Sequence, residues 1–496
     1  MEKSKIVLIE PSQIINDLLP AFMDYMRKEE GFYVIFIVST IEDIKFYNKK
    51  FKNHYDEIIH SSMEFDFISK KFNINDLYKK ALEIEKRLGV TLSRLFISDR
   101  TIGRGLHASG GFNHPKTRLH SNSNHAEIIK IAVSKVIFWE KLIKKKGVCM
   151  TLGLPNVGHL IAQSYKLPSY RAYDARFGNR MFWTSDLYLQ PDSLESYYNK
   201  NKNKVFKKIN IELPYQSHMT YRKMDLEAFK FIATLQFSFI QILRRFYGIY
   251  RGYRKAKNIY AYDEFKYIWR KRKDFNNLRK TSNINNKSLK NIKYIYFPLI
   301  AEPEVALHGI AQDFFFQLSA INMLSRDLPS NYRIVVKEHL LAIGRRPRDF
   351  YRQILDLKNV MMADPLDLGL PYIKNAQAVA CITGTAAWEA VVMGIPVISF
   401  SKNNAFNFLE HVFTVTDPDD TIKILNNICF KSWPNKKSIN DGASFYNSCI
   451  KDSFDTLDRD SFISWGKEKT TKDKEKKTKV LAKLLFKELK LKLKNN

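Results

Sequence analysis

A small-residue turn followed by a helix suggests a site for a phosphate ester. The apolar run at residues 378–382 leads into Thr383-Gly384-Thr385, and the helical pattern TAAWEAVVMG overlaps the end of this turn. Small residues let a ligand approach a helix N-terminus, where backbone N–H groups and the positive dipole end favour a phosphate. Thr383 and Thr385 add hydroxyl donors, and Glu389 is placed to accept a hydrogen bond from a ribose hydroxyl. The alternative is an ordinary turn with Thr385 as the helix N-cap and Glu389 as a first-turn charge.

A second polar group ends the strand-like run RIVV. The residues that follow it are Lys337, Glu338 and His339. Side chains alternate along a strand, so Lys337 and His339 are expected on one face, where a cation and an imidazole would complete a nucleotide clamp. A solvated strand end is the alternative. The arginines that come next, Arg345, Arg346 and Arg348, could add phosphate contacts, and a solvated basic helix start is the simpler interpretation.

A third segment, FPLIAEPE at residues 297–304, joins another strand-like stretch to a Pro-rich loop. Loops at the carboxyl edge of a parallel sheet often contact ligands, which makes Glu304 a binding candidate. The alternative is a Pro-bearing turn with an exposed glutamate.

The order of apolar and helical stretches predicts the elements that carry these residues. Short apolar runs alternate with helical patterns of about 10–15 residues, which is typical of βαβ units and mostly parallel sheets. The expected fold class is α/β, with two Rossmann-like domains and a basic helical insert. The expected segments are an N-terminal domain at residues 1–205, the insert with a linker at 206–290 and a second α/β domain at 291–430. A return segment at 431–466 and a Lys-rich tail at 467–496 follow.

In the first domain the run LSRLFIS, residues 92–98, is expected to be a strand that ends beside Asp99. A carboxylate at such an end could act as a general acid or base, although most such residues are caps or surface groups. Asp174, in YRAYDARFGNR, follows another predicted strand and is a further candidate.

Composition excludes several classes of protein. The chain has 496 residues, 45% of them hydrophobic, so it can form sizeable cores and wholesale disorder is excluded. Four scattered cysteines without a CxxC pair argue against a structural zinc site and against a disulfide framework. The chain has no apolar run of about 18 residues, and MEKSKIVLIEPSQ is typical of a first strand. We therefore expect a cytoplasmic protein without a spanning helix, and no run typical of a metal site is present.

The formal net charge of +30 predicts an anionic partner. Residues 214–290 hold 18 Lys/Arg and 5 Asp/Glu, interleaved with aromatic residues, and residues 467–496 hold 12 Lys and 4 Asp/Glu. Aromatic and basic residues suit a membrane surface, and a solvated basic helix pair is the alternative. No signature of a nucleic-acid-binding module is present, so no nucleic-acid partner is expected. The tail is either a peripheral anchor or a frayed terminus.

The segments FPLIAEPE, VVKEH and TGTAAWEAVVMGIPVISFS, in this order, resemble the bacterial capsular polysaccharide biosynthesis proteins. These are GT-B-type glycosyltransferases, some of which use CMP-activated Kdo. The likeness covers about 110–140 residues, and the third segment is the most specific. The family has a proline after the histidine of the second segment, where this chain has Leu340.

The resemblance implies a GT-B-like fold whose two domains face each other across a cleft. It maps Lys337 and His339 to the phosphate region of a donor and Glu389 to its nucleotide side. The phosphate turn is mapped to Thr383, Gly384 and Thr385. Glu304 is a donor-binding candidate from its place in the loop. The implied activity is sugar transfer from a nucleotide-activated donor to a lipid-linked or glycan acceptor, with Asp99 and His339 as catalytic candidates and no cofactor. An anionic inner-membrane surface is the expected further partner. A nucleotide-sugar epimerase and a non-catalytic capsule-assembly scaffold are the alternatives.

Overall fold

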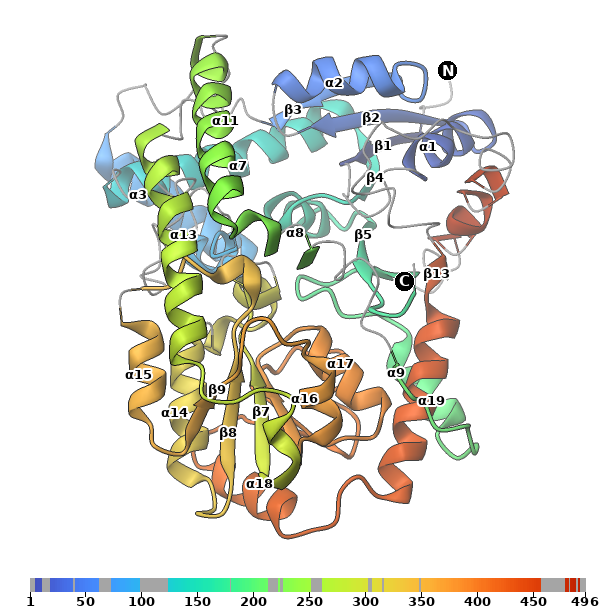
Figure 1. Cartoon of the computed structure of the whole chain (residues 1–496). Helices are drawn as coiled ribbons and strands as arrows, with labels where there is room; N and C mark the ends of the chain where they lie inside the picture. Colours follow the sequence, from blue (N-terminus) through green and yellow to red (C-terminus); the bar gives the residue numbers. More distant parts are fainter. Residues whose placement is uncertain are drawn as a thin grey trace. The chain divides into compact units, whose positions relative to one another are not determined.

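The protein forms two compact units, drawn in the computed structural model of Figure 1. Unit 1 comprises residues 1–106, 120–192 and 450–496, and unit 2 comprises residues 107–119 and 193–449. The helical insert therefore belongs to unit 2, and the tail belongs to unit 1. The structure describes residues 5–10, 18–38, 41–61, 73–98, 124–178, 180–212, 222–223, 226–250, 261–301, 306–314, 316–347, 349–455, 478–480, 482–487 and 489–490.

Unit 1 contains a seven-stranded sheet in the order β13-β6-β5-β4-β1-β2-β3. Strands β1 to β5 pair in parallel, and β6 and β13 add an antiparallel edge. The strands are β1 Lys5–Ile9, β2 Phe32–Val38, β3 Glu57–His60, β4 Val148–Leu152, β5 Ser169–Asp174, β6 Arg180–Thr184 and β13 Phe454–Asp455. The continuous apolar run in β2 is typical of a strand covered on both faces.

Six helices lie between these strands in the described part of unit 1. They are α1 Leu19–Lys28, α2 Ile41–Phe51, α3 Ile74–Leu88, α4 Leu92–Leu95, α7 His125–Lys146 and α8 Asn156–Ser164. Helix α7 begins at a capping box, in which Asn124 accepts from the N–H of Glu127 and Glu127 accepts from the N–H of Asn124.

The prediction of a strand at residues 92–98 is wrong, because α4 begins there. Thr91 caps this helix by accepting a hydrogen bond from the N–H of Arg94, and Glu85 accepts one from the N–H of Leu92. These local bonds favour a helical turn over the strand suggested by the apolar residues.

The tail completes the core of unit 1. Its residues 478–480, 482–487 and 489–490 are helical, and Ala482, Leu485, Phe486 and Leu489 are buried. The ring of Phe486 packs against those of Phe22, Tyr25 and Phe32. The apolar face that could have entered a membrane is therefore occupied within the protein.

Unit 2 contains a six-stranded, fully parallel sheet in the order β12-β11-β10-β7-β8-β9. The strands are β7 Tyr294–Pro298, β8 Arg333–Lys337, β9 Val360–Met362, β10 Ala378–Cys381, β11 Val397–Ser399 and β12 Val412–Thr414. Numbered from β7, this arrangement is the 3-2-1-4-5-6 order of a Rossmann fold. Unit 1 has the same order in its strands β1 to β6. The predicted α/β class with two Rossmann-like units is confirmed.

Helices cover both faces of the sheet in unit 2 (Figure 1). On one face α14, α15 and α18 share a core with alternate residues of the strands, and on the other α16 and α17 pack beside Tyr294 and Tyr296. The helices are α9 Leu194–Asn201, α11 Phe231–Tyr250, α13 Ala261–Thr281, α14 Gln317–Asp327, α15 Phe350–Asp356, α16 Leu370–Asn375, α17 Thr385–Val392, α18 Asp420–Cys429 and α19 Lys436–Asp452. Shorter helical turns are Ser288–Asn291, Ala306–Ile310, Gln312–Phe314 and Leu340–Ala342.

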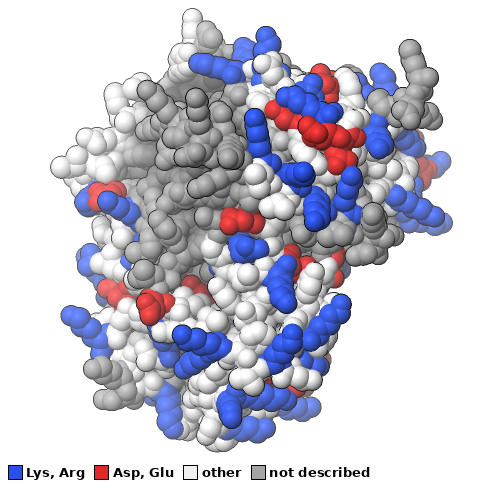
Figure 2. All heavy atoms as spheres, turned by 90° about the vertical axis from the view of Figure 1, so that its right-hand side faces the viewer, with Lys and Arg blue, Asp and Glu red and all other residues white. Residues whose placement is uncertain are grey.

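The positive charge is not confined to the insert and the tail. On the face shown in Figure 2, Lys and Arg side chains are distributed over the described surface and do not gather in one patch. No helix among the described residues is long and apolar enough to cross a membrane.

Candidate functional site

Two strand ends meet at the centre of the sheet in unit 2. Strands β7 and β10 are neighbours, and the strand order runs outward from them in opposite directions. Open α/β sheets bind ligands outside the carboxyl ends of the strands at this reversal. The ends here are Pro298 and Cys381, so the loop after Pro298 and the turn at Thr383 border the expected site.

The turn at residues 383–385 is open around its glycine. Gly384 precedes α17 with φ +110° and ψ 167°, a conformation that only glycine adopts readily. Apart from the adjoining residues of its own chain segment, no atom of the described residues lies within 4 Å of the position that a Cβ of Gly384 would take. Space is therefore available beside the first turn of α17, where the helix dipole favours an anion.

Thr383 holds a polar atom that this turn leaves without a partner. Its side chain is 3% exposed, and its Oγ1 has no hydrogen-bond partner among the described residues. A buried hydroxyl in this state costs about 1–3 kcal/mol. A ligand oxygen at the turn would supply the missing partner.

Glu389 lies one turn into α17, in surroundings that disfavour its charge. Burial raises the pKa of its carboxyl to about 7. Its charge acts on the buried Tyr296, whose ring stacks on Tyr372 with centroids 5.6 Å apart. The Tyr372 hydroxyl donates to Asp367 Oδ2 at 2.7 Å. A row of buried and partly buried polar groups therefore extends from Glu389 toward β9.

Lys337 lies at the other end of this row. It is buried at the end of β8, and desolvation together with the nearby Arg222 lowers its pKa to about 8, against the opposing effect of Asp367. Arg222 itself donates to the carbonyl of Leu366. The site thus combines a cationic end at β8 with the open turn at β10.

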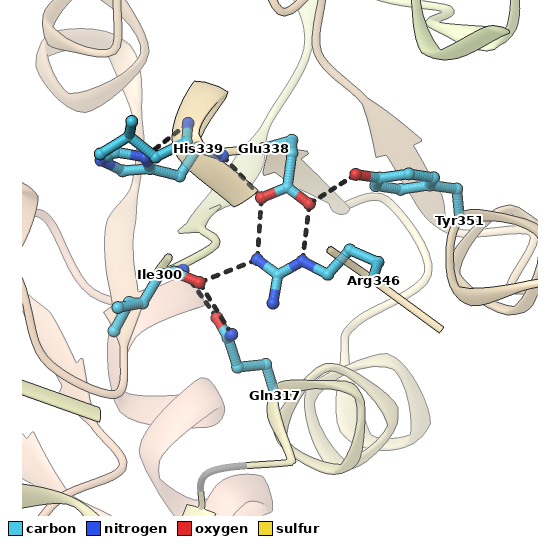
Figure 3. A network of polar contacts seen from close by, with 7 residues as sticks. Ile300, Gln317, Glu338, His339, Arg346 and Tyr351 are labelled. Atoms are coloured by element: carbon cyan, nitrogen blue, oxygen red, sulfur yellow. Dashed lines mark hydrogen bonds and ion pairs between the residues drawn. The ribbon is translucent and has the colours of Figure 1, made fainter. Parts of the chain in front are cut away.

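Glu338 and Arg346 hold the loops at this edge together (Figure 3). Arg346 donates to both carboxylate oxygens of Glu338, and its Nη2 also donates to the carbonyl of Ile300 at 2.8 Å. The Tyr351 hydroxyl donates to Glu338 at 2.9 Å, and Gln317 exchanges two hydrogen bonds with the backbone of Ile300. The expectation that Arg346 belongs to a solvated surface is wrong, because its side chain is 2% exposed and paired with Glu338. Sequence patterns did not reveal this pair, since the two residues are eight positions apart and lie in a loop.

His339 is exposed and caps a short helical turn. Its Nδ1 accepts a hydrogen bond from the N–H of Leu341 at 3.2 Å, and the turn Leu340–Ala342 follows. Leu340, which stands where the resembling family has proline, is buried as the first residue of this turn.

Sequence reasoning missed a polar loop after β11. Asn404 Nδ2 donates to the carbonyl of Ile382 at 2.8 Å and to Ser399 Oγ at 2.9 Å. Ser401 and Asn403 both donate to the carbonyl of Ile310. This loop therefore fixes the backbone just before Thr383. The signal was the sequence SKNN directly after a buried strand, a place where polar residues often serve a site.

The structure thus brings Thr383, Gly384, Thr385 and Glu389 together on one strand–turn–helix unit, with Lys337 and His339 at the end of β8. The candidates Asp99 and Glu304 lie outside the described residues. Asp174 ends β5 as predicted, and its Oδ1 accepts from the N–H of Arg176 at 2.7 Å. In the described part of the chain, no group of His, Cys, Asp and Glu residues could hold a metal ion.

No protein-family model and no curated protein matches this chain. Solved structures that are similar include HepE of Anabaena in complex with UDP, with TM-score 0.33 and 11% identity over 93% of this chain and 98% of the other. KpsC of Thermosulfurimonas dismutans, a β-Kdo 2,7 transferase, has TM-score 0.28 and 13% identity over 65% and 81%. A putative UDP-N-acetylglucosamine 2-epimerase from Listeria monocytogenes has TM-score 0.27 and 10% identity over 89% and 91%. These TM-scores are all below 0.5, so the three likenesses assign no activity to this chain.

Proposed function

We propose that this chain is a glycosyltransferase of surface polysaccharide assembly. It takes a sugar from a nucleotide-activated donor similar to CMP-Kdo and transfers it to a lipid-linked or glycan acceptor. The observation that carries the proposal is the open turn at Gly384 with the unpartnered, buried hydroxyl of Thr383 beside it. Both lie at the reversal of a Rossmann-ordered sheet, the place where such sheets bind nucleotides.

In the proposed reaction an acceptor hydroxyl attacks the anomeric carbon while the bond from that carbon to the phosphate oxygen breaks. The departing nucleotide gains negative charge. The hydroxyls of Thr383 and Thr385, the N-terminus of α17, Lys337 and His339 would stabilise that charge. Glu389 would accept a hydrogen bond from a ribose hydroxyl, and Glu304 would contact the donor. Asp99 would act as the general base that takes the proton of the acceptor hydroxyl.

The first test is a calorimetric binding screen of CMP, UDP and GDP against the whole protein and Glu389→Ala. We expect selective binding of one nucleotide by the wild type and a loss of about tenfold or more in the variant, since a hydrogen bond to a charged group contributes about 1.5–3 kcal/mol. Glu410→Ala removes an exposed carboxylate of unit 2 that pairs with Lys437, and serves as the control. Equal binding by Glu389→Ala and the wild type would remove Glu389 from the site.

Turnover distinguishes the alternatives. Release of nucleotide that depends on an added acceptor supports transfer. Conversion of the sugar nucleotide without any acceptor would instead indicate an epimerase. Nucleotide binding without turnover on any acceptor would indicate a scaffold, an alternative consistent with Leu340 in place of the proline of the resembling family.

A further inference from the structure

Helix α11 carries its large apolar side chains on the outside. Six of them share one face at helical spacing and are between 44% and 86% exposed: Ile232, Leu235, Phe239, Leu243, Phe246 and Tyr250. The buried residues of this helix are instead small and polar, Thr234 and Ser238. This distribution reverses the usual pattern of a surface helix, in which the apolar face is turned inward.

The inward residues are satisfied within their own helix. Thr234 Oγ1 donates to the carbonyl of Lys230 at 2.8 Å, and Ser238 Oγ donates to that of Thr234 at 2.7 Å. Helix α11 packs beside α13, as Figure 1 shows, with the rings of Phe231 and Trp269 6.0 Å apart. The large outward side chains therefore contribute little to holding the helix in place.

The positive charges around α11 favour an anionic partner. Residues 226–281 hold 14 Lys/Arg and four Asp/Glu, and four of these cations on α13 are exposed: Lys266, Lys273, Arg279 and Lys280. A second copy of the chain would bring an equally positive surface against this one, and the two would repel each other. An anionic lipid surface matches both features, because acyl chains accept the apolar face and headgroups attract the cations.

We propose that α11 lies in the plane of an anionic membrane, with its apolar stripe (the six residues listed above) buried at the boundary between headgroups and acyl chains. No described helix is apolar enough to span a bilayer, so the mode is interfacial. The proposal concerns a surface apart from the donor site and does not depend on nucleotide binding.

The helix pair is fastened to the loop that carries the ion pair of Figure 3. Arg270 Nη2 donates to the carbonyl of Arg346 at 2.7 Å, and Arg345 Nε donates to the Tyr267 hydroxyl at 3.1 Å. Gly344 lies so close to α13 that a Cβ there would be 2.7 Å from Lys271 Cα. A membrane-bound α11 would therefore hold the donor site of unit 2 at a fixed depth from the bilayer.

The test is sedimentation of the full-length protein with vesicles. One set contains phosphatidylcholine alone, and the other contains phosphatidylcholine with about one third phosphatidylglycerol. We expect binding to the anionic set that weakens in high salt. The variant Phe239→Gln/Leu243→Gln/Phe246→Gln is expected to lose about tenfold or more in partitioning, because burying even one such side chain contributes about 1.5–3 kcal/mol.

Gln is a good helix former, so circular dichroism and the melting temperature should stay unchanged in this variant. Ile422→Gln/Phe430→Gln, at exposed apolar positions in and after α18, is the control and should bind vesicles like the wild type. Vesicle binding by the triple variant equal to that of the wild type would overturn the proposal. The proposal would also be overturned if the wild type did not bind anionic vesicles, or if it formed dimers through these residues instead. Nucleotide binding by the triple variant is measured separately, so failure of the donor proposal remains distinguishable.

Discussion

Arg346 and Glu338 form a bidentate ion pair from which water is excluded. Arg346 Nη2 donates to Oε1 at 2.8 Å and Nε donates to Oε2 at 2.9 Å, and the two side chains are 2% and 0% exposed. The cost of removing both charges from water is offset only while both partners are present. Because Arg346 also bonds to Ile300, the pair joins the loops that follow β7 and β8.

Removal of one partner of this pair should be costly. Arg346→Met leaves the carboxylate of Glu338 buried without its cation, and we expect a loss of about 3–5 kcal/mol in the free energy of unfolding, measured in urea. Arg352→Met breaks the exposed pair with Asp349 and should cost about 0–1 kcal/mol. A small effect of Arg346→Met would show that the pair does not stabilise these loops.

Thr383→Val separates a ligand-binding role from a structural one. Because the buried hydroxyl has no partner among the described residues, its removal should raise the free energy of unfolding by about 1 kcal/mol while it weakens nucleotide binding. The control is Thr184→Val, since the buried Thr184 donates to the carbonyl of Arg171 at 3.1 Å and its loss should destabilise the protein. Destabilisation by Thr383→Val would contradict the proposed role.

Gly384→Ala tests the turn through its backbone. No described atom would collide with the new Cβ, so the expected loss of about 1–3 kcal/mol comes from the unfavourable φ of +110°, and nucleotide binding should fall with it. Gly89 ends α3 at φ +66° with equally open space around it. Gly89→Ala should therefore cost about 1 kcal/mol and leave nucleotide affinity unchanged. An unchanged affinity in Gly384→Ala would place the ligand elsewhere.

The pKa of Glu389 makes stability depend on pH. Folding raises this pKa from 4.5 to about 7, so the folded state binds the proton more tightly than the unfolded state. The contribution of this group to stability is therefore complete below pH 4.5 and is lost as the pH rises through 7. Glu389→Gln should be more stable than the wild type by about 1–3 kcal/mol at pH 8, with the difference shrinking toward pH 5. Urea unfolding at both pH values checks this, and curves that stay parallel would refute it.

Two adjacent leucines in the tail test its role in the core of unit 1. Leu485 is 1% exposed and Leu484 is 50% exposed. We expect Leu485→Ala to cost about 2–5 kcal/mol, because it leaves a cavity, and Leu484→Ala to stay within about 0.5 kcal/mol of the wild type. Equal melting temperatures for the two variants would mean that the tail does not pack as described.

Much of the fold could be predicted from the sequence, because parallel strands buried on both faces appear as continuous apolar runs. The turn at Thr383 was recognisable from its small residues and from the helix after it. Two contacts could not be predicted: the ion pair of Glu338 with Arg346, and the hydrogen bond from Asn404 to the carbonyl of Ile382. Each depends on loops that only the folded sheet brings together. At residues 92–98, local capping by Thr91 outweighed the apolar pattern.

The return of the tail to unit 1 also bears on the order of folding during synthesis. All the residues assigned to unit 2 have been synthesised by residue 449, whereas the core of unit 1 still lacks Leu485 and Leu489 at that point. Domains usually fold as units, the N-terminal one first. Here the residues of unit 2 are all synthesised before the last residues of unit 1. The apolar core residues of unit 1 therefore stay partly uncovered until Leu485 and Leu489 have been added.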